Sequence, residues 1–290
     1  MKISIKSNAY FDNNLTQGFE QGLATMRAHG YDGFDFQGFG AMKDGLISLS
    51  QSEWEKKLNS LRTAAQNEGL YICQAHAPGR YPPQDATEAD RNDRFLTKVR
   101  ALEGAAMLEC PYLVVHPILP YGTKVNVNPD GVWEINVEFF SRLADKAKEY
   151  GVTLCYENMP FKVFPFSKPE YVIKMVKEVN HPYFKCCLDT GHAALYEDVS
   201  DSVRTMGDSL VTVHVHDNDG DGDKHWLPYT GVIDWQAFCK ALGEIDFNGY
   251  FSLECMVRGN YPPKLLEYYR IGLAKTARML ADAVEREKSL

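Results

Sequence analysis

The sequence predicts an α/β fold, a single (β/α)8 TIM barrel domain spanning residues 1–290. Three observations support this prediction: strand-like apolar runs alternate with amphipathic stretches, eight such units can be counted, and no long linker or low-complexity segment interrupts them. A chain of 290 residues with 44% hydrophobic content can bury a core of this size. A doubly wound open sheet is the alternative that the same alternation allows.

Eight short apolar runs have the composition and length of strands. The expected strands, in chain order, are Ile3–Ser7, Gly33–Phe36, Tyr71–His76, Tyr112–His116, Thr153–Glu157, Lys185–Asp189, Leu210–His216 and Tyr250–Glu254. Each is followed by a longer stretch before the next strand begins, as a barrel of repeated β/α units requires.

The stretches between the strands carry apolar residues at helical spacing. The helices expected from this spacing are Thr16–His29, Glu53–Glu68, Glu88–Glu109, Val137–Tyr150, Pro169–Val179 and a closing helix from Pro262 to about Glu287. Ser50 and Glu53 have the spacing of a capping box, which favours a helix start at this point.

Composition disfavours several classes of protein. No stretch approaches the roughly 18 consecutive apolar residues that span a membrane, and the charged, alternating N-terminal segment does not resemble a signal peptide, so a soluble, cytoplasmic protein is expected. Seven cysteines without Cys-x-x-Cys spacing predict reduced core thiols. A formal charge of -8 argues against a nucleic-acid or membrane partner, while a homo-oligomer stays open.

Histidine and acidic residues gather at the carboxyl ends of the expected strands, where the chemistry of such barrels takes place. They are His76, His116, Glu157, Asp189 followed by His192, His214 followed by His216, and Glu254. Oxygen and imidazole donors that converge from separate strands suit Mn²⁺, Mg²⁺, Zn²⁺ or Fe²⁺. We therefore expect a metal centre at this end of the barrel.

The segments around these residues resemble the xylose isomerase-like TIM barrel superfamily, which includes sugar phosphate isomerases and epimerases and the AP endonucleases of family 2. The matching pieces are Glu157-Asn158, Leu188 to His192, His214 to Asn218, Asp223 to His225, and Leu253-Glu254. The resemblance covers nearly the whole chain. It implies one divalent ion held by Glu157, Asp189, His214 and Glu254, with Mn²⁺ or Zn²⁺ expected first and Mg²⁺, Co²⁺ or Fe²⁺ as alternatives.

On the seventh strand, the resemblance selects His214 over His216 as the ligand, because family members place it three residues before an acidic position, here Asp217. The implied activity is that of a sugar, sugar phosphate or cyclitol isomerase or epimerase with a small-molecule carbohydrate substrate. A divalent ion would stabilise an enediolate while Glu157 and Glu254 move the protons. The residues expected to contact the substrate are His76, His116, His192, His225 and Arg258.

Two other functions stay open. An endonuclease IV-like trinuclear zinc phosphodiesterase acting on abasic DNA would use further ligands, and the matching residues are His76, His116, His192, Asp223 and His225. Gly79 argues against this function, because the DNA enzymes usually carry a bulky residue there, and the acidic run around Gly220 would repel a phosphate backbone. An inosose dehydratase-like lyase is the other alternative. Ketohexose epimerases carry arginine where this chain has Gly220, so different substrate contacts are expected.

Overall fold

The computed structural model describes residues 1–40, 45–79, 85–122, 128–162, 165–257 and 260–290. Within these ranges, eight parallel strands follow one another in the order β7-β6-β5-β4-β3-β2-β1-β8. The strands are β1 (Ile3–Lys6), β2 (Gly33–Phe36), β3 (Tyr71–His76), β4 (Tyr112–Val115), β5 (Thr153–Glu157), β6 (Phe184–Asp189), β7 (Leu210–His214) and β8 (Phe251–Leu253).

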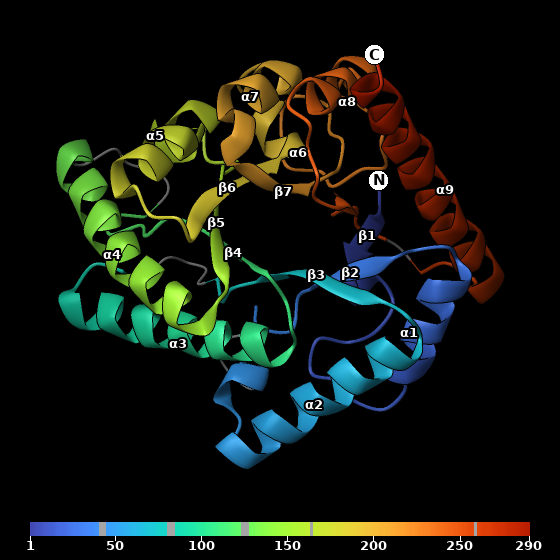
Figure 1. The fold of residues 1–290 in the computed structure, drawn as a ribbon, viewed down its shortest axis with the longest axis horizontal. Helices are drawn as coiled ribbons and strands as arrows, with labels where there is room; N and C mark the ends of the chain where they lie inside the picture. The colour runs from blue at the N-terminus through green and yellow to red at the C-terminus, as the bar shows by residue number, and fades with distance from the viewer. Residues whose placement is uncertain (41–44, 80–84, 123–127, 163–164, 258–259) are drawn as a thin grey trace.

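Helices surround these strands on the outside (Figure 1). They are α1 (Phe19–Ala28), α2 (Gln51–Asn67), α3 (Glu88–Met107), α4 (Pro129–Tyr150), α5 (Pro169–Val179), α6 (Thr190–Ala193), α7 (Val199–Met206), α8 (Trp235–Glu244) and α9 (Pro263–Lys288). Short 3-10 turns are η1 (Ser7–Ala9), η2 (Leu46–Ser48), η3 (Pro165–Ser167) and η4 (Gly207–Ser209). The last helix packs against β1 and β8, which are neighbours in the sheet.

The sheet closes on itself between β7 and β8. Val215 and Leu253 form a parallel bridge. The Val215 amide donates to the Ser252 carbonyl at 2.8 Å, and the Glu254 amide donates to the Val215 carbonyl at 2.9 Å. The fold is therefore a (β/α)8 barrel as predicted, and the open doubly wound sheet is excluded.

Most predicted strands agree with the structure to within one residue, and the main differences have local causes. Strand β7 ends at His214 instead of His216, because Val215 turns to pair with β8 and close the barrel. Helix α4 begins at Pro129 and not at Val137, because the Asn128 side chain accepts a hydrogen bond from the Gly131 amide and caps the helix earlier. Helices α6, α7 and α8 are not among the ranges named from the sequence.

The cysteines are core residues, as predicted. All seven, each within a described range, are buried and unpaired. Cys155 and Cys187 pack with Val114 inside the barrel. None of the helices described is long and apolar enough to cross a membrane.

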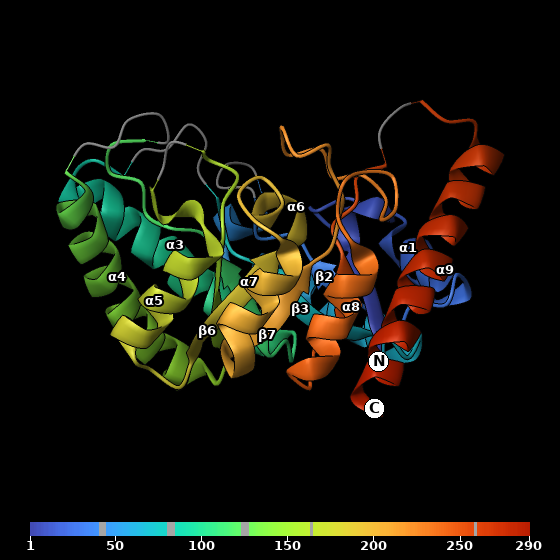
Figure 2. The same ribbon diagram turned by 90° about the horizontal axis from the view of Figure 1, so that it is seen from above.

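The two faces of the barrel differ. Figure 2 shows the loops that follow the strands gathered on one face, with both chain termini on the opposite face. Because all strands are parallel, their carboxyl ends meet on the loop-covered face. Side chains at the strand ends are therefore brought together there.

Candidate metal centre

Strand alternation turns the predicted site residues into the barrel. In β5, Cys155 packs inside the barrel, so Glu157, two residues later, points into the same interior. The same argument applies to Cys187 and Asp189 in β6. Asp189 and His214 are register partners on neighbouring strands, so His214 faces the interior as well. Each of these three site residues is at most 1% exposed.

Four of these residues form a central group. The ligand atoms of Glu157, Asp189, His214 and Glu254 lie within 4.8 Å of one another. His214 Nδ1 is 2.6 Å from Glu157 Oε1 and 3.8 Å from Glu254 Oε2. Three carboxylates around one imidazole carry excess negative charge, which is unfavourable in a buried site without a cation. The set of carboxylate oxygens with one imidazole nitrogen therefore fits a divalent metal ion.

The acidic and imidazole groups of the central group stabilise one another's charged forms. Burial opposes ionisation of Glu157, but His214 and the hydrogen bond from His116 hold the pKa of this carboxyl well below its usual range. Burial lowers the basicity of His214, yet the charges of Glu157 and Glu254 raise its pKa well above the usual value. A metal ion bound here would compete with protonation of His214, because histidine binds metals as neutral imidazole.

A second group joins Glu157 to the two histidines of β3 and β4. His116 Nε2 lies 2.8 Å from Glu157 Oε2, and His76 Nε2 lies 3.5 Å from the same oxygen. The Nε2 atoms of the two imidazoles are 3.0 Å apart. Burial, opposed by Glu157 and reinforced by His76, lowers the pKa of His116 to about 4. Glu157 therefore bridges this group, through Oε2, and the central group, through Oε1.

A third group lies on the other side of the central one. The ligand atoms of His192, His216, Asp223 and His225 lie within 4.8 Å of one another. His225 Nε2 is 3.1 Å and His192 Nε2 is 3.5 Å from Asp223 carboxylate oxygens. His216, which the family spacing did not select, is fully buried and lies 2.9 Å from Asp189 Oδ1. Asp189 thus connects this group to the centre, as Glu157 does on the opposite side.

Asp35 is a residue of the centre that was not predicted from the sequence. It is fully buried in β2, and its Oδ2 lies 2.9 Å from His214 Nε2. The Gln74 side-chain amide donates to the same oxygen at 3.3 Å. A carboxylate that accepts the Nε2 proton would hold His214 in the tautomer that leaves Nδ1 free for a metal ion. The sequence signal that could have identified Asp35 is its position as a single charged residue within the apolar run Gly33–Phe36.

Substitution of Asp35 by asparagine is expected to weaken metal binding by about 10- to 100-fold, because His214 would lose its orienting carboxylate. Competition with a chelating indicator measures this affinity. The matched control is Asp208→Asn, which removes an exposed carboxylate at the opposite end of the barrel. An affinity of Asp35→Asn within threefold of the unmodified protein would contradict an orienting role.

A cavity of about 350 Å³ lies over the three groups. It is lined by all of the predicted site residues that the structure describes except Asp189 and His214, which lie beneath it. Met159, Pro160 and Phe161, which follow β5, provide an apolar wall. Arg258, expected at the substrate site, lies outside the described residues. The predicted ligands and substrate contacts that are described thus share one cavity or its floor.

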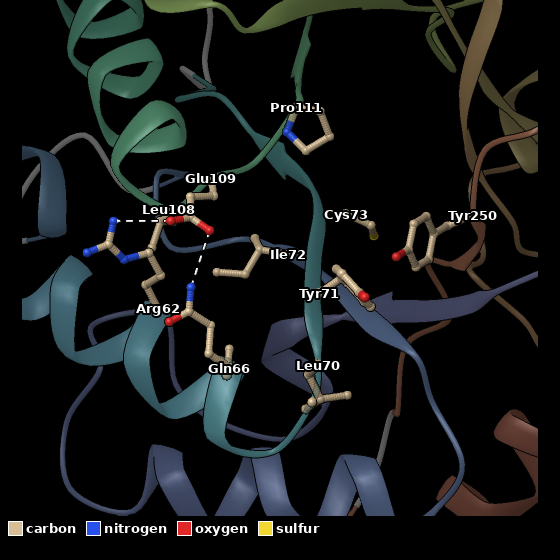
Figure 3. A pocket seen from close by; sticks show the side chains of 12 residues that line it. Arg62, Gln66, Leu70, Tyr71, Ile72, Cys73, Leu108, Glu109, Pro111 and Tyr250 are labelled. Carbon is tan, nitrogen blue, oxygen red and sulfur yellow. Dashed lines mark hydrogen bonds and ion pairs between the residues drawn. The ribbon is translucent and has the colours of Figure 1, made fainter.

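Another cavity, of about 460 Å³, lies at the amino-terminal end of the strands (Figure 3). Tyr71 and Tyr250 contribute aromatic rings to it. The carboxylate of Glu109 is paired with Arg62 at 3.5 Å and receives a hydrogen bond from Gln66 at 3.2 Å. The residues described along its wall include no histidine. Its side chains therefore do not form a metal-binding set like that of the opposite face.

Comparison with known proteins gives consistent matches. The family model described as xylose isomerase-like TIM barrel matches residues 23–277. A D-psicose 3-epimerase of Ruminiclostridium cellulolyticum is 26% identical over 207 residues, covering 70% of this chain and 69% of that protein. An uncharacterized protein of Methanocaldococcus jannaschii is 27% identical over 266 residues, and the match covers 88% of this chain and 83% of that protein.

Solved structures share the architecture. The crystal structure of D-psicose 3-epimerase in the presence of D-fructose has a TM-score of 0.79 at 20% sequence identity, covering 97% of this chain and 99% of that one. The structure of the IOLI protein with a binding zinc atom has a TM-score of 0.75 at 21% identity, with 100% of both chains covered. At these identities the likeness shows a common fold.

Proposed function

The chain belongs to the xylose isomerase-like TIM barrel family, and from this premise we propose that it is a divalent metal-dependent isomerase or epimerase of a sugar, sugar phosphate or cyclitol. The observation that carries the proposal is the central group of Glu157, Asp189, His214 and Glu254, whose ligand atoms lie within 4.8 Å of one another. Relatives named D-psicose 3-epimerase support a carbohydrate substrate.

The proposed chemistry is transfer of a proton next to a carbonyl group. A divalent ion held by the central group would polarise the substrate carbonyl and stabilise the enediolate formed from it. Glu157 and Glu254 both line the cavity and come from β5 and the end of β8, so they reach the substrate from different strands. One removes the proton from the carbon next to the carbonyl, and the other delivers a proton to the opposite face or to the neighbouring carbon.

Other residues of the cavity hold the substrate and restrict water. His192 is oriented by a 2.9 Å hydrogen bond between its Nδ1 and the Asn158 carbonyl, so its Nε2 faces Asp223 and the cavity. Met159 and Phe161 present apolar surface beside the carboxylates. Such walls limit solvent access to a reactive enediolate. We assign His192, with His76, His116 and His225, to contacts with substrate hydroxyl groups.

Metal content and the fate of the substrate proton test this function. Elemental mass spectrometry on protein purified without chelators or a histidine tag is expected to find about one divalent ion per chain bound by the four central ligands. With ketoses in deuterium oxide, NMR is expected to show deuterium at the carbon next to the carbonyl. Protein that holds no divalent ion, or that exchanges no proton with any sugar, sugar phosphate or cyclitol tested, would overturn the proposal.

A second function is kept because one observation favours it. The His76, His116 and Glu157 group, the central group, and the His192, His216, Asp223 and His225 group together offer ligands for three metal ions. Three zinc ions per chain and cleavage of DNA at an abasic site would favour an endonuclease IV-like phosphodiesterase. Gly79 at the cavity wall offers no side chain to insert into a duplex, which favours the sugar enzyme. Loss of water from a cyclitol would instead favour an inosose dehydratase-like lyase.

A further inference from the structure

Three buried charged residues lie in or just before α3, next to the cavity, and one of them, Arg94, lines it. Asp85, Arg94 and Lys98 are 1%, 5% and 1% exposed. Arg94 and Lys98 are one helical turn apart on α3, and Arg94 lines the same cavity as His76 and His116. The charge of Lys98 acts on His116, where it helps to lower the pKa of that imidazole, after burial and His76. The three residues therefore adjoin the proposed active site.

The charges of these residues do not balance. Arg94 Nε donates to Asp85 Oδ1 at 3.0 Å, and Arg94 Nη2 donates to Asp85 Oδ2 at 3.2 Å. Asp85 Oδ2 also accepts the Leu119 amide at 3.0 Å. The single carboxylate thus neutralises Arg94. Among the residues that the structure describes, the Lys98 ammonium makes neither a hydrogen bond nor an ion pair, so one positive charge is in excess.

Hydrogen-bond donors are also in excess. A guanidinium group has five N–H bonds. In the described ranges Arg94 uses one at Nε, one at Nη2 and one at Nη1, which donates to the Pro78 carbonyl at 3.4 Å. Among the described residues, two N–H bonds of Arg94 and the ammonium of Lys98 therefore have no hydrogen-bond acceptor. Burial and then Arg94 lower the pKa of Lys98 to about 7, as expected where an anion is missing.

We propose that the wall at Arg94 and Lys98 binds an anionic group of the substrate, either a carboxylate or a phosphate ester. Arg94 offers its free N–H bonds to the anion, and Lys98 supplies the balancing charge from behind. Gly79, which lines the same cavity, leaves open space, because a Cβ added there would meet no atom within 4 Å. This inference rests on the proposed function and narrows its substrate to a sugar acid or a sugar phosphate.

Isothermal titration of the metal-loaded protein with inorganic phosphate and with acetate tests the proposal. Lys98→Met, which keeps an unbranched side chain one atom shorter but removes the charge, is expected to weaken anion binding at least tenfold. Lys98→Arg, which keeps the charge, is expected to stay within threefold of the unmodified protein. The matched control is Lys146→Met, which removes a charge from an exposed pair with Glu149 on α4. Thermal unfolding of each variant confirms that it is folded.

Tighter binding of phosphate indicates a phosphate ester, and tighter binding of acetate indicates a carboxylate. The proposal is overturned if neither ion binds the unmodified protein, or if Lys98→Met and Lys146→Met bind the ions equally well. Anion binding is measured without turnover. A failure of the anion-binding proposal can therefore be distinguished from a failure of the proposed isomerase or epimerase function. Proton exchange with neutral sugars alone would support the isomerase or epimerase while removing the anionic substrate.

Discussion

Replacement of Glu254 by glutamine is expected to lower kcat by about 10²- to 10⁴-fold with any sugar that the protein converts, and to reduce its metal content. The substitution removes a metal ligand and one of the two proposed proton-transfer groups. The Glu254 side chain is 12% exposed and lines the cavity, so an amide of the same size should leave the fold intact. Steady-state kinetics and elemental mass spectrometry on the same preparation measure both effects.

The matched control for this variant is Glu134→Gln, an exposed glutamate on α4. Its kcat and metal content are expected to equal those of the unmodified protein. A variant at Glu254 that retains the metal but loses activity would assign this residue to proton transfer more than to ligation. A kcat of Glu254→Gln within tenfold of the unmodified value would contradict both roles.

Substitution of Lys98 by methionine is expected to raise the free energy of unfolding by up to about 5 kcal/mol at pH 7 and below. The pKa of Lys98 falls from 10.5 to about 7 in the folded protein, because the ammonium is buried beside Arg94. Each unit of that difference corresponds to about 1.4 kcal/mol. Methionine has a similar shape and carries no charge to desolvate, so the whole penalty is removed.

The sign of the pH dependence follows from the order of the two pKa values. Between pH 7 and 10.5 the unfolded chain binds a proton at Lys98 that the folded chain releases, so the unmodified protein gains stability as the pH rises through this window. The penalty is complete below pH 7 and absent above pH 10.5. The advantage of Lys98→Met should therefore fall to about 2 kcal/mol at pH 9.

Urea denaturation at pH 6 and pH 9, in buffers without phosphate or carboxylates, measures this difference. Lys146→Met is again the control, since its exposed ammonium pairs with Glu149 on the surface of α4. Its effect on stability should be within about 1 kcal/mol at either pH. An equal gain for Lys98→Met at both pH values would show that its ammonium is not held in a charge-excluding environment.

Much of the fold could be predicted because its signals are local. Each strand is a short apolar run and each helix an amphipathic stretch, and both patterns depend on residues close in sequence. The predicted and observed boundaries differ where contacts with a distant part of the chain determine the end of an element. Val215 would continue β7 by its own pattern, but its backbone pairs with Ser252 and Glu254 to close the barrel. The start of α4 is an exception, because its cap at Asn128 is a local signal that the apolar spacing alone does not include.

The candidate site was partly predictable for the same reason. The carboxyl ends of parallel strands must meet on one face, so the pattern of the sequence is enough to expect Glu157, Asp189 and Glu254 to converge. The partner of His214 could not be found in this way, because Asp35 lies 179 residues away in the chain and contributes one charge to an apolar strand. The family spacing favoured His214 over His216, although the fold also buries His216 against Asp189.

By itself, the sequence determined the barrel, the reduced cysteines and the face on which the proposed ligands gather, because strand and helix patterns repeat over short distances. Only the tertiary structure decided which ligands share a carboxylate, with Glu157 and Asp189 each connecting two groups. It also decided that Lys98 is buried, although lysine in an amphipathic helix is expected to face solvent. Burial and charge pairing depend on neighbours distant in the chain, and these are brought together when the barrel closes.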